Sequence, residues 1–425
     1  MRRTFKAGAG YWRDFTLSLL KWLVFSVVVG VVVGAIGAVF HMAIDYGTEL
    51  RGEYGWILYF LPLAGLLIVW LYHVTDMSDD KGTEYIIRAA HDGKPLRIRT
   101  ALLIFISTVL THLTGGSAGR EGAALQLGGS ISNTIGRLSN KLGSAFQIDD
   151  KDERVITMCG MAAGFAALFG TPLSAAIMAM EVVSVGLMYY TAIVPCVLSA
   201  IIAQAVAGAI GVAPTAYTVL SVPEVTPLVL LQVVFLGVLC AAVAILFCGV
   251  MHVGPKFYAK ITKNPYVKAI LGGAIIVVLS LFVGTDYNGA GVHVIENALL
   301  GQARPEAFLL KMIFTALTLA AGFKGGEIVP AFFCGATFGC VFGGLIGLPA
   351  SFAAAAGMTA VFCGVTNCPL TAILLSLELF GGEGLVLYAL CCAVSFMISG
   401  YTSLYHSQEF IHSKLKLVEI EKKEA

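Results

Sequence analysis

The sequence predicts an all-α polytopic membrane protein, and three observations support this fold class. The chain of 425 residues has a mean hydropathy of +0.85 and only 12% charged residues, whereas soluble domains carry about 25%. Stretches without a formal charge cover residues 22–43, 182–222 and 227–253, and about 20 apolar residues are enough to span a bilayer. The 48 glycines are typical of membrane helices that pack closely.

The composition also excludes several functional classes. With 27 Lys and Arg against 26 Asp and Glu, the net charge of +1 argues against a nucleic-acid-binding protein. The high apolar content argues against disorder. All ten cysteines lie within apolar stretches, where they are expected to behave as small hydrophobic residues rather than as disulfides or metal ligands. No cofactor and no metal site are predicted.

The N-terminal residues predict a cytoplasmic tail followed by the first membrane helix. Arg2, Arg3 and Lys6 precede an apolar run that begins at Leu19 and is too long for a signal peptide. Basic residues next to a membrane helix favour the cytoplasmic side. We therefore expect a tail over residues 1–12 and a single membrane domain over residues 13–407.

Four polar segments interrupt the apolar sequence, at residues 77–99, 140–154, 256–268 and from 408 to the end. Each contains Lys or Arg, so the charge bias by itself does not assign every loop to one side of the membrane. The last segment is expected to be a short cytoplasmic stretch, amphipathic over residues 409–420, without an appended regulatory domain.

Two halves of the chain share a sequence pattern. A shift of 197 aligns residues 160–181 with 357–378 at eight identical positions, including a Pro-Leu-[Ser/Thr]-Ala-x5-Glu run in both halves. A shift of 207 aligns glycines of residues 119–136 with those of 326–343. Carboxylates are rare in membrane segments, so the shared glutamate argues against a chance match. We expect two repeats, over about residues 56–210 and 226–407.

Both repeats contain a glycine-rich segment that is too broken to cross the membrane simply, at residues 119–138 and 328–345. Broken segments at matching places in two halves indicate a transporter binding site.

The strongest local signal precedes the first of these segments. Residues 115–122 read Gly-Gly-Ser-Ala-Gly-Arg-Glu-Gly and lead into an apolar helix. Small residues allow backbone N–H groups to turn toward a ligand, and a helix start adds a partial positive charge, which suits an anion or a carboxylate in its place. Arg120 and Glu121 are costly inside apolar sequence unless they pair or line an aqueous path. The alternative is an ion pair that fixes a loop at the membrane surface.

The matching stretch of the second repeat, residues 324–330, reads Lys-Gly-Gly-Glu-Ile-Val-Pro. Pro330 suits the first turn of a helix, so we expect a second helix N-terminus that faces the first. Glu327 lies beside it, either as a functional carboxylate or as a helix-start capping residue.

Other ionisable residues are assigned structural roles. Glu181 and Glu378 end the repeated Pro-Leu runs and are expected to bond backbone groups at the ends of the repeats. His112, one turn before the glycine loop, is expected to be a packing residue rather than a proton relay.

These motifs resemble those of the CLC family of anion channels and transporters. Residues 119–122, followed by Gln126 and a glycine pair, resemble its G-R-E-G-P…Q-x-G-G element. Residues 325–330 resemble its G-G-I-F-A-P element, and the repeated Pro-Leu runs resemble its two P-L-containing segments. The resemblance covers about residues 13–408. It implies a homodimer, with one anion pathway per subunit built from two inverted repeats of tilted and broken helices.

The resemblance also assigns functional residues. By position, Glu121 is the gating glutamate, whose carboxylate competes with anions and carries protons, and we add Glu327 as a second proton-transfer residue. The family's anion-coordinating tyrosine falls on Tyr401, with Tyr405 close enough to be confused with it. The anion-binding positions are Met77, Gly119, Arg120, Gly122, Ala123, Ile328, Val329 and Tyr401.

Departures from the chloride-type pattern resemble the family's bacterial fluoride-exporting branch. Met77 is nearest the place of the anion-facing serine, and Ala123 replaces a proline. Glu327 replaces an isoleucine, and Val182 occupies the position of the internal proton-transfer glutamate. We therefore expect a proton-coupled fluoride antiporter in the multi-pass inner membrane of a bacterium. Its partners would be fluoride and protons, with chloride as a further candidate ion, and membrane lipid.

Two alternatives remain open at the level of the sequence. A chloride/proton exchanger or a passive chloride channel would have the same fold. An intramembrane enzyme using Glu121 and Glu327 as paired acids is disfavoured, because the chain carries none of the usual nucleophile or metal motifs.

Overall fold

The computed structural model describes residues 9–80, 82–93, 95–141 and 146–414. Most of the predicted N-terminal tail, and the part of the C-terminal segment after residue 414, lie outside the described residues. The first half contains the helices α1 (Ala9–Glu53), η1 (Gly55–Phe60), α2 (Leu61–Val74), α3 (Thr83–Asp92), α4 (Ile98–Leu113), α5 (Glu121–Ser139), α6 (Asp150–Phe169), α7 (Pro172–Glu181), η3 (Tyr190–Ala192) and α8 (Ile193–Ile210).

The second half repeats this helical pattern. Its helices are α9 (Pro227–Ile261), α10 (Pro265–Val283), α11 (Val292–Leu299), α12 (Ala307–Ala320), α13 (Ile328–Leu345), α14 (Ala350–Thr366), α15 (Pro369–Phe380) and α16 (Leu385–Ile398). Two short strands, β1 (Ser184–Val185) and β2 (Glu409–Phe410), pair in parallel and attach the end of the chain to the segment after α7.

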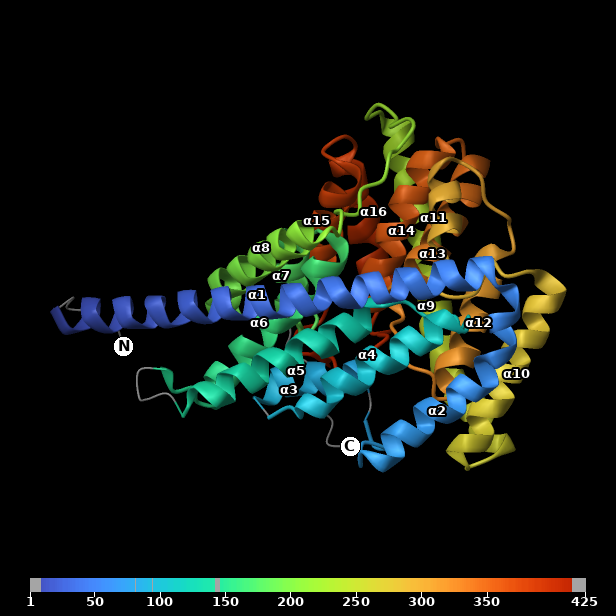
Figure 1. Cartoon of the computed structure of the whole chain (residues 1–425). Coiled ribbons are helices and arrows are strands. Elements are labelled where there is room, and N and C mark those ends of the chain that lie inside the picture. The colour runs from blue at the N-terminus through green and yellow to red at the C-terminus, as the bar shows by residue number, and fades with distance from the viewer. Residues whose placement is uncertain (1–8, 81, 94, 142–145, 415–425) are drawn as a thin grey trace.

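Helix lengths confirm a multi-pass membrane architecture with tilted helices. Within the described residues, six helical stretches are long and apolar enough to cross a membrane, at Phe15–Glu53, Gly55–Val74, Tyr190–Ile210, Pro227–Ile261, Pro265–Val283 and Ile328–Leu345. At 1.5 Å per residue the 45 residues of α1 extend about 68 Å, more than twice a hydrocarbon core of about 30 Å. Figure 1 shows α1 crossing the full width of the molecule, so it is strongly tilted.

Local chemistry explains where several helices begin. Helices α7, α9, α10 and α15 each have proline in the first turn, where the missing N–H has no cost. The Asp149 carboxylate caps α6 by accepting hydrogen bonds from the N–H groups of Lys151 and Asp152. The N–H of Asp152, which has the largest effect, and the N–H of Lys151 lower the pKa of Asp149.

The glycines of α5 and α13 do not break these helices, contrary to the sequence-based expectation. Both helices are continuous, and the breaks lie in the loops before them. A side chain at Gly128 would collide with the carbonyl of Gly160, and one at Gly335 with the carbonyl of Gly357. The glycines instead allow α5 to pack against α6, and α13 against α14, at backbone contact.

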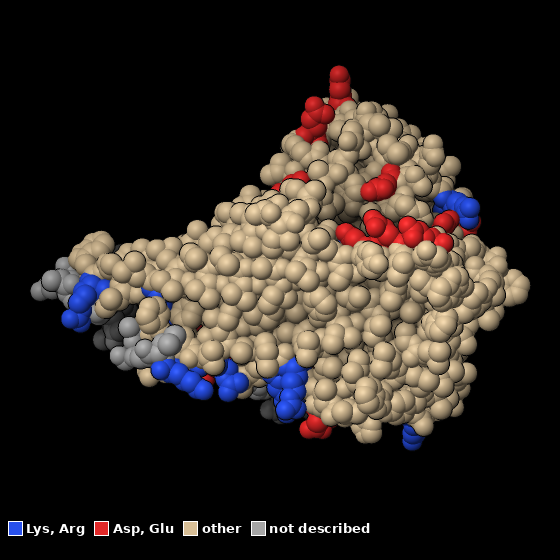
Figure 2. Space-filling model, viewed as in Figure 1, with Lys and Arg blue, Asp and Glu red and all other residues tan. Residues whose placement is uncertain are grey.

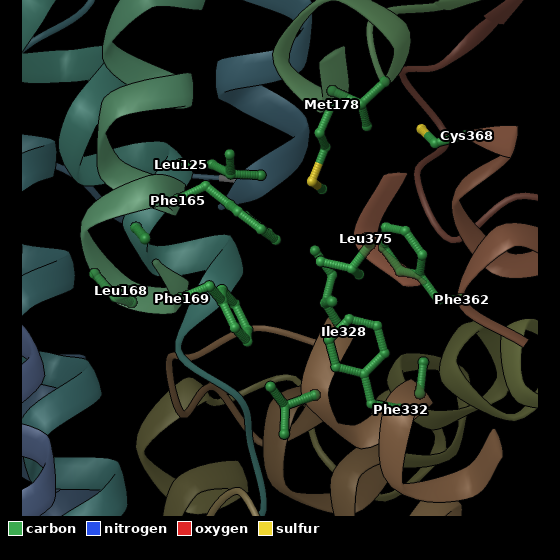
Figure 3. Close-up of a cluster of buried hydrophobic side chains, with 14 of the residues drawn as sticks. Leu125, Phe165, Leu168, Phe169, Met178, Ile328, Phe332, Phe362, Cys368 and Leu375 are labelled. Carbon is green, nitrogen blue, oxygen red and sulfur yellow. The ribbon is translucent and has the colours of Figure 1, made fainter. Parts of the chain in front are cut away.

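The two halves meet in a shared apolar core. Figure 3 shows Leu125, Phe165, Phe169 and Met178 of the first half facing Ile328, Phe332, Phe362 and Leu375 of the second. The Phe169 and Phe332 rings pack edge to face at 6.2 Å. This core surrounds the ends of the loops that precede α5 and α13.

The faces of the molecule differ in charge. Figure 1 shows the α9–α10 turn at the lower edge, and the α8–α9 and α15–α16 connections at the upper edge. In the same view Lys and Arg lie mainly along the lower edge, and Asp and Glu lie on the upper part and in a notch beside it (Figure 2). The structure thus gathers the basic loops on one face.

Candidate functional site

Two glycine-containing loops, one from each half, meet inside the protein. Gly119 and Gly326 form an antiparallel bridge in which each N–H donates to the other carbonyl at 2.7 Å. A side chain at Gly326 would lie 2.6 Å from the backbone nitrogen of Gly122. Only residues without a side chain permit this approach. The bridge therefore brings the beginnings of α5 and α13 together, as the sequence predicted.

The Glu121 carboxylate lies between these helix starts. Its Oε2 accepts hydrogen bonds from the N–H of Arg120 at 3.0 Å and from the N–H of Val329 at 3.2 Å. The side chain is fully buried, and its Oε1 has no hydrogen-bond partner within the described residues. A side chain at Gly119 would collide with Oε2, which explains the glycine there. The carboxylate occupies a place in which two N–H groups and two helix dipoles favour an anion.

Glu327 lies at the N-cap position of α13, but its side chain makes no capping hydrogen bond. Its Oε2 is buried and has no hydrogen-bond partner within the described part of the chain. The carboxylate is within electrostatic range of Glu84 and Glu121. The structure therefore does not support the capping role that the sequence left open, and it brings a second acidic group close to Glu121.

Arg120 contributes to the site through its backbone. Its guanidinium Nη1 donates to Asp45 Oδ1 at 2.7 Å, and Asp45 Oδ2 lies 3.1 Å from His41 Nε2. The ion pair expected as an alternative thus exists for Arg120, but with Asp45 rather than Glu121. The side chain of Arg120 is already occupied, so the predicted anion contact is limited to its N–H.

Two polar side chains beside the loops were not predicted as part of the site. Gln126 Nε2 donates to the Gly122 carbonyl at 3.3 Å and to Thr83 Oγ1 at 3.4 Å. Thr83 Oγ1 would lie 2.6 Å from a side chain built at Gly122. The position of Gln126 one turn after Gly122 is a signal in the sequence. Thr83 has no such signal, because it reaches the site from α3.

The other predicted positions on α5 and α13 are buried at the helix starts. Ala123 and Ile328 are fully buried, and the Ile328 side chain belongs to the apolar core of Figure 3. At Ile328 the backbone, and not the side chain, is available at the site.

The structure corrects the assignment of the tyrosine. Tyr401 is 52% exposed, and its hydroxyl lies 2.9 Å from Ser413 Oγ on the surface. Tyr405 is 2% exposed, within electrostatic range of Glu327 and Glu121, and its hydroxyl has no hydrogen-bond partner among the described residues. Tyr405 therefore replaces Tyr401 as the candidate. The two residues lie four apart without a periodic pattern around them, so the sequence could not distinguish them.

Met77 is buried, but its contacts are with its neighbours on the same face. Its N–H donates to the Tyr72 carbonyl at 2.9 Å, and its sulfur accepts a weak contact from Arg97 Nη1 at 3.8 Å. Thr83, the first residue of α3 after the same loop, is the one that contacts Gln126. A role of Met77 in the pathway stays a prediction.

The structural roles expected for Glu181 and Glu378 are confirmed, whereas the packing role expected for His112 stays a prediction. Glu181 accepts hydrogen bonds from the N–H groups of Leu370 and Thr371 at 3.1 and 2.9 Å, and Glu378 does the same for Leu173 and Ser174 at 2.9 Å each. His112 is buried, with Nδ1 2.9 Å from the Thr108 carbonyl of its own helix. Each glutamate ties the end of one repeat helix to the start of its counterpart, which is the relation expected of inverted repeats.

Glu121 is reached from the upper side through a cavity of about 240 Å³. Its wall includes Arg120, Tyr217, Glu296, Val329 and Phe332. The Glu121 side chain is itself part of the cavity wall.

Comparisons with known proteins agree with this geometry. A family model described as voltage gated chloride channel matches residues 64–400. A chloride/fluoride channel protein of Pseudomonas syringae is 36% identical over 409 residues, which cover 94% of this chain and 89% of that protein. The H(+)/Cl(-) exchange transporter ClcA of Vibrio parahaemolyticus is 25% identical over 395 residues, covering 86% and 83% of the two chains.

A solved structure extends the comparison to three dimensions. The crystal structure of a CLC-type fluoride/proton antiporter matches with a TM-score of 0.87 and 30% identity, over 92% of this chain and 98% of that chain. The chain, a multi-pass membrane protein, therefore belongs to the voltage gated chloride channel family, the CLC transporters and channels of chloride and fluoride.

Proposed function

We propose that this protein is a proton-coupled antiporter that exports fluoride from a bacterial cell. The observation that carries the proposal is the Glu121 carboxylate held between the N–H groups of Arg120 and Val329. The likeness to a fluoride/proton antiporter over nearly the whole chain supports the choice of ion.

The geometry suggests how one group serves both ions. When Glu121 is ionised, its carboxylate accepts from both N–H groups and blocks the pathway. When Glu121 takes up a proton from the outer cavity, its hydrogen bonds to the two N–H donors weaken, because a neutral carboxyl is a poorer acceptor. The donors then become available to a fluoride ion, and the proton moves with the side chain. Fluoride is small and strongly hydrated, so it needs short hydrogen bonds from fixed donors to leave water.

Glu327 is proposed as the second proton-transfer group. The position of the chloride exchangers' internal glutamate is occupied by Val182, whose side chain is buried and whose carbonyl accepts from Gln408 Nε2 at 3.1 Å. A proton released from Glu121 toward the inside therefore needs another acceptor, and Glu327 lies nearby with an unpartnered oxygen. Met77 and Tyr405 are proposed on the inner side of the anion site.

We further propose the orientation, the assembly and the domain limits. The face with the basic loops is placed in the cytoplasm of a bacterial inner membrane, following the positive-inside bias. The protein is proposed to act as a homodimer with one pathway per subunit. The membrane domain is taken as residues 13–407, with repeats over about 56–210 and 226–407.

Halide efflux from proteoliposomes, recorded with fluoride, chloride and pH electrodes, tests the function. We expect fluoride to leave faster than chloride and to drive protons inward, and we expect Glu121→Gln to abolish proton movement. Equal fluoride and chloride flux with coupled protons would instead indicate a chloride/proton exchanger, the activity named for the Vibrio relative. Halide flux without proton movement in the unmodified protein would indicate a passive channel.

A further inference from the structure

The cavity above Glu121 adjoins a second, larger cavity of about 650 Å³. The two cavities share Arg120, Ala290, Val292 and Glu296 in their walls. We call the larger cavity the outer vestibule, because it opens on the face opposite the basic loops. An ion that leaves or approaches Glu121 from this face therefore passes beside Glu296 and the vestibule.

The vestibule carries an excess of negative charge. The charged groups in its wall are Asp45, Glu49, Arg51, Arg120 and Glu296. Arg120 is paired with Asp45 at 2.7 Å. Arg51 donates to the neutral His112 carbonyl and keeps its positive charge, so the three acidic and two basic groups leave an excess of one negative charge. The other ion pairs nearby join Asp286 to His293 and to Arg304. Glu49 and Glu296 take part in no ion pair within the described residues, and both are exposed.

Two buried polar atoms indicate that the vestibule is a hydrated space. Asn288 Nδ2 and His112 Nε2 have no hydrogen-bond partner within the described chain, although these residues are only 2% and 1% exposed. Both residues line the vestibule. Buried polar atoms of this kind are normally satisfied by water or by an ion. The vestibule and the path to Glu121 thus form one polar compartment.

The acidic character continues over the surrounding surface. Figure 2 shows Asp and Glu side chains in the notch and on the upper part of the molecule, with few Lys or Arg among them. A cleft lined by charges of one sign focuses the electrostatic potential and changes the local concentration of small ions. A negative potential raises the local proton concentration and lowers the local fluoride concentration.

We propose that Glu49 and Glu296 make the outer vestibule a charge filter, which repels fluoride that has left the cell and concentrates protons for Glu121. This inference rests on the proposed fluoride/proton exchange. The filter leaves the equilibrium set by the two ion gradients unchanged. It acts on the apparent affinities of the outer side, making external fluoride a poorer substrate and external protons a better one.

The titratable and charged groups that face Glu296 come from several elements. They are Asp45, Glu49 and Arg51 from α1, His112 from α4, Arg120 and Glu121 at the start of α5, Tyr217 from the α8–α9 connection and His293 from α11. None of the cationic groups among them is paired with Glu49 or Glu296 in the described structure, so replacing these two glutamates removes negative charge without freeing a cation.

The test compares two double variants in membrane vesicles of both orientations. Glu49→Gln with Glu296→Gln removes the filter. Glu224→Gln with Glu383→Gln removes the same charge from exposed residues on the upper connections, outside both cavities. Fluoride uptake into right-side-out vesicles is measured against external fluoride and external pH, and inside-out vesicles report the cytoplasmic side.

For the filter variant we expect the KM for external fluoride to fall about two- to fivefold, as expected for two partly screened charges near the path. The external pH at half-maximal flux should move to lower pH, because a more acidic bulk solution is needed for the same local proton concentration. Both differences should shrink at 1 M salt, where the screening length is about 3 Å. The KM of the filter variant measured in inside-out vesicles should stay unchanged. The external KM of the control variant should stay unchanged as well.

An unchanged external KM in the filter variant, or an equal change in the control variant, would overturn the inference. A loss of flux in inside-out vesicles would show damage to the transporter itself. If the unmodified protein moves fluoride without protons, the proposed function fails, yet the external fluoride KM still tests the repulsion by the two glutamates.

Discussion

At Glu121, two backbone N–H groups replace the cationic partner that a buried carboxylate usually requires. Arg120 supplies its N–H while its guanidinium is held by Asp45, so the charge that the sequence places next to Glu121 is directed elsewhere. Neutral donors bind an anion more weakly than a cation does, which suits the movement proposed for the Glu121 side chain. A side chain at Gly119 would meet Glu121 Oε2, so the carboxylate would have to shift.

The two tyrosines near the chain end offer a matched test at the residue scale. We expect Tyr405→Phe to weaken the apparent affinity for fluoride severalfold, because its buried hydroxyl is free to donate to an ion near Glu121 and Glu327. Tyr401→Phe should have no such effect, since that hydroxyl faces Ser413 at the surface. The dependence of the efflux rate on fluoride concentration gives the apparent affinity of each variant. Equal effects of the two substitutions would contradict the corrected assignment.

The role of Glu327 is tested by replacing its carboxyl, which can bind and release a proton, with an amide of nearly the same size. Glu327→Gln is expected to lower proton-coupled fluoride flux at least tenfold, because the amide cannot accept and release a proton between Glu121 and the inside. Simultaneous recording of pH and fluoride reports the coupling. Coupled flux at the level of the unmodified protein would show that protons leave Glu121 by another route.

At the scale of the elements, glycines determine how closely the helices of each repeat pair can approach. Gly128 of α5 faces the Gly160 carbonyl of α6, and Gly335 of α13 faces the Gly357 carbonyl of α14 in the same relation. This close packing holds the starts of α5 and α13 in position, so the geometry around Glu121 also depends on α6 and α14, which contribute no group to it.

Gly128→Ala should therefore lower the free energy of unfolding by about 1–3 kcal/mol or more, because the added methyl forces α5 and α6 apart. Gly208→Ala in α8 serves as the control, since nothing lies within 4 Å of the added atom. Alanine there should stabilise the helix by up to about 1 kcal/mol. Thermal unfolding of the purified protein in detergent compares the two. A Gly128→Ala protein as stable as the control would show that the helix pair can adjust.

At the scale of the whole molecule, the two halves are joined by reciprocal contacts. Glu181 of α7 binds the start of α15, and Glu378 of α15 binds the start of α7. Together with the Gly119–Gly326 bridge, these contacts tie the repeats at the site and at the helix ends. In each half the glutamate of this run binds the helix start of the other half. This reciprocal contact explains why the Pro-Leu-[Ser/Thr]-Ala-x5-Glu run occurs twice.

Removing either glutamate should destabilise the fold without changing the proton coupling. Glu181→Ala leaves the N–H groups of Leu370 and Thr371 without their acceptor, at a cost of about 1–3 kcal/mol for the buried Thr371 group. Glu378→Ala should behave alike in the other half. The unfolding temperature and the proton-to-fluoride ratio are measured together. A changed ratio in Glu181→Gln would assign that carboxylate to the proton path.

The sequence by itself determined the membrane class, the repeat, the family and the positions of Glu121 and Glu327. These features depend on composition, on spacing along the chain and on charges placed in apolar sequence, all of which are local. The repeated glutamates were also assigned correctly to structure, since two matched carboxylates at helix ends have matched backbone donors.

The tertiary structure alone decided which groups meet across the chain. It directed the Arg120 side chain to Asp45, placed Tyr405 rather than Tyr401 in the interior, and brought Thr83 to the site from a distant helix. It also placed Lys and Arg mainly along one edge of the molecule. Glu49 and Glu296, from distant helices, came together in the wall of one cavity. Such facts depend on the packing of helices far apart in sequence, and hydropathy carries no information about which side chains that packing brings into contact.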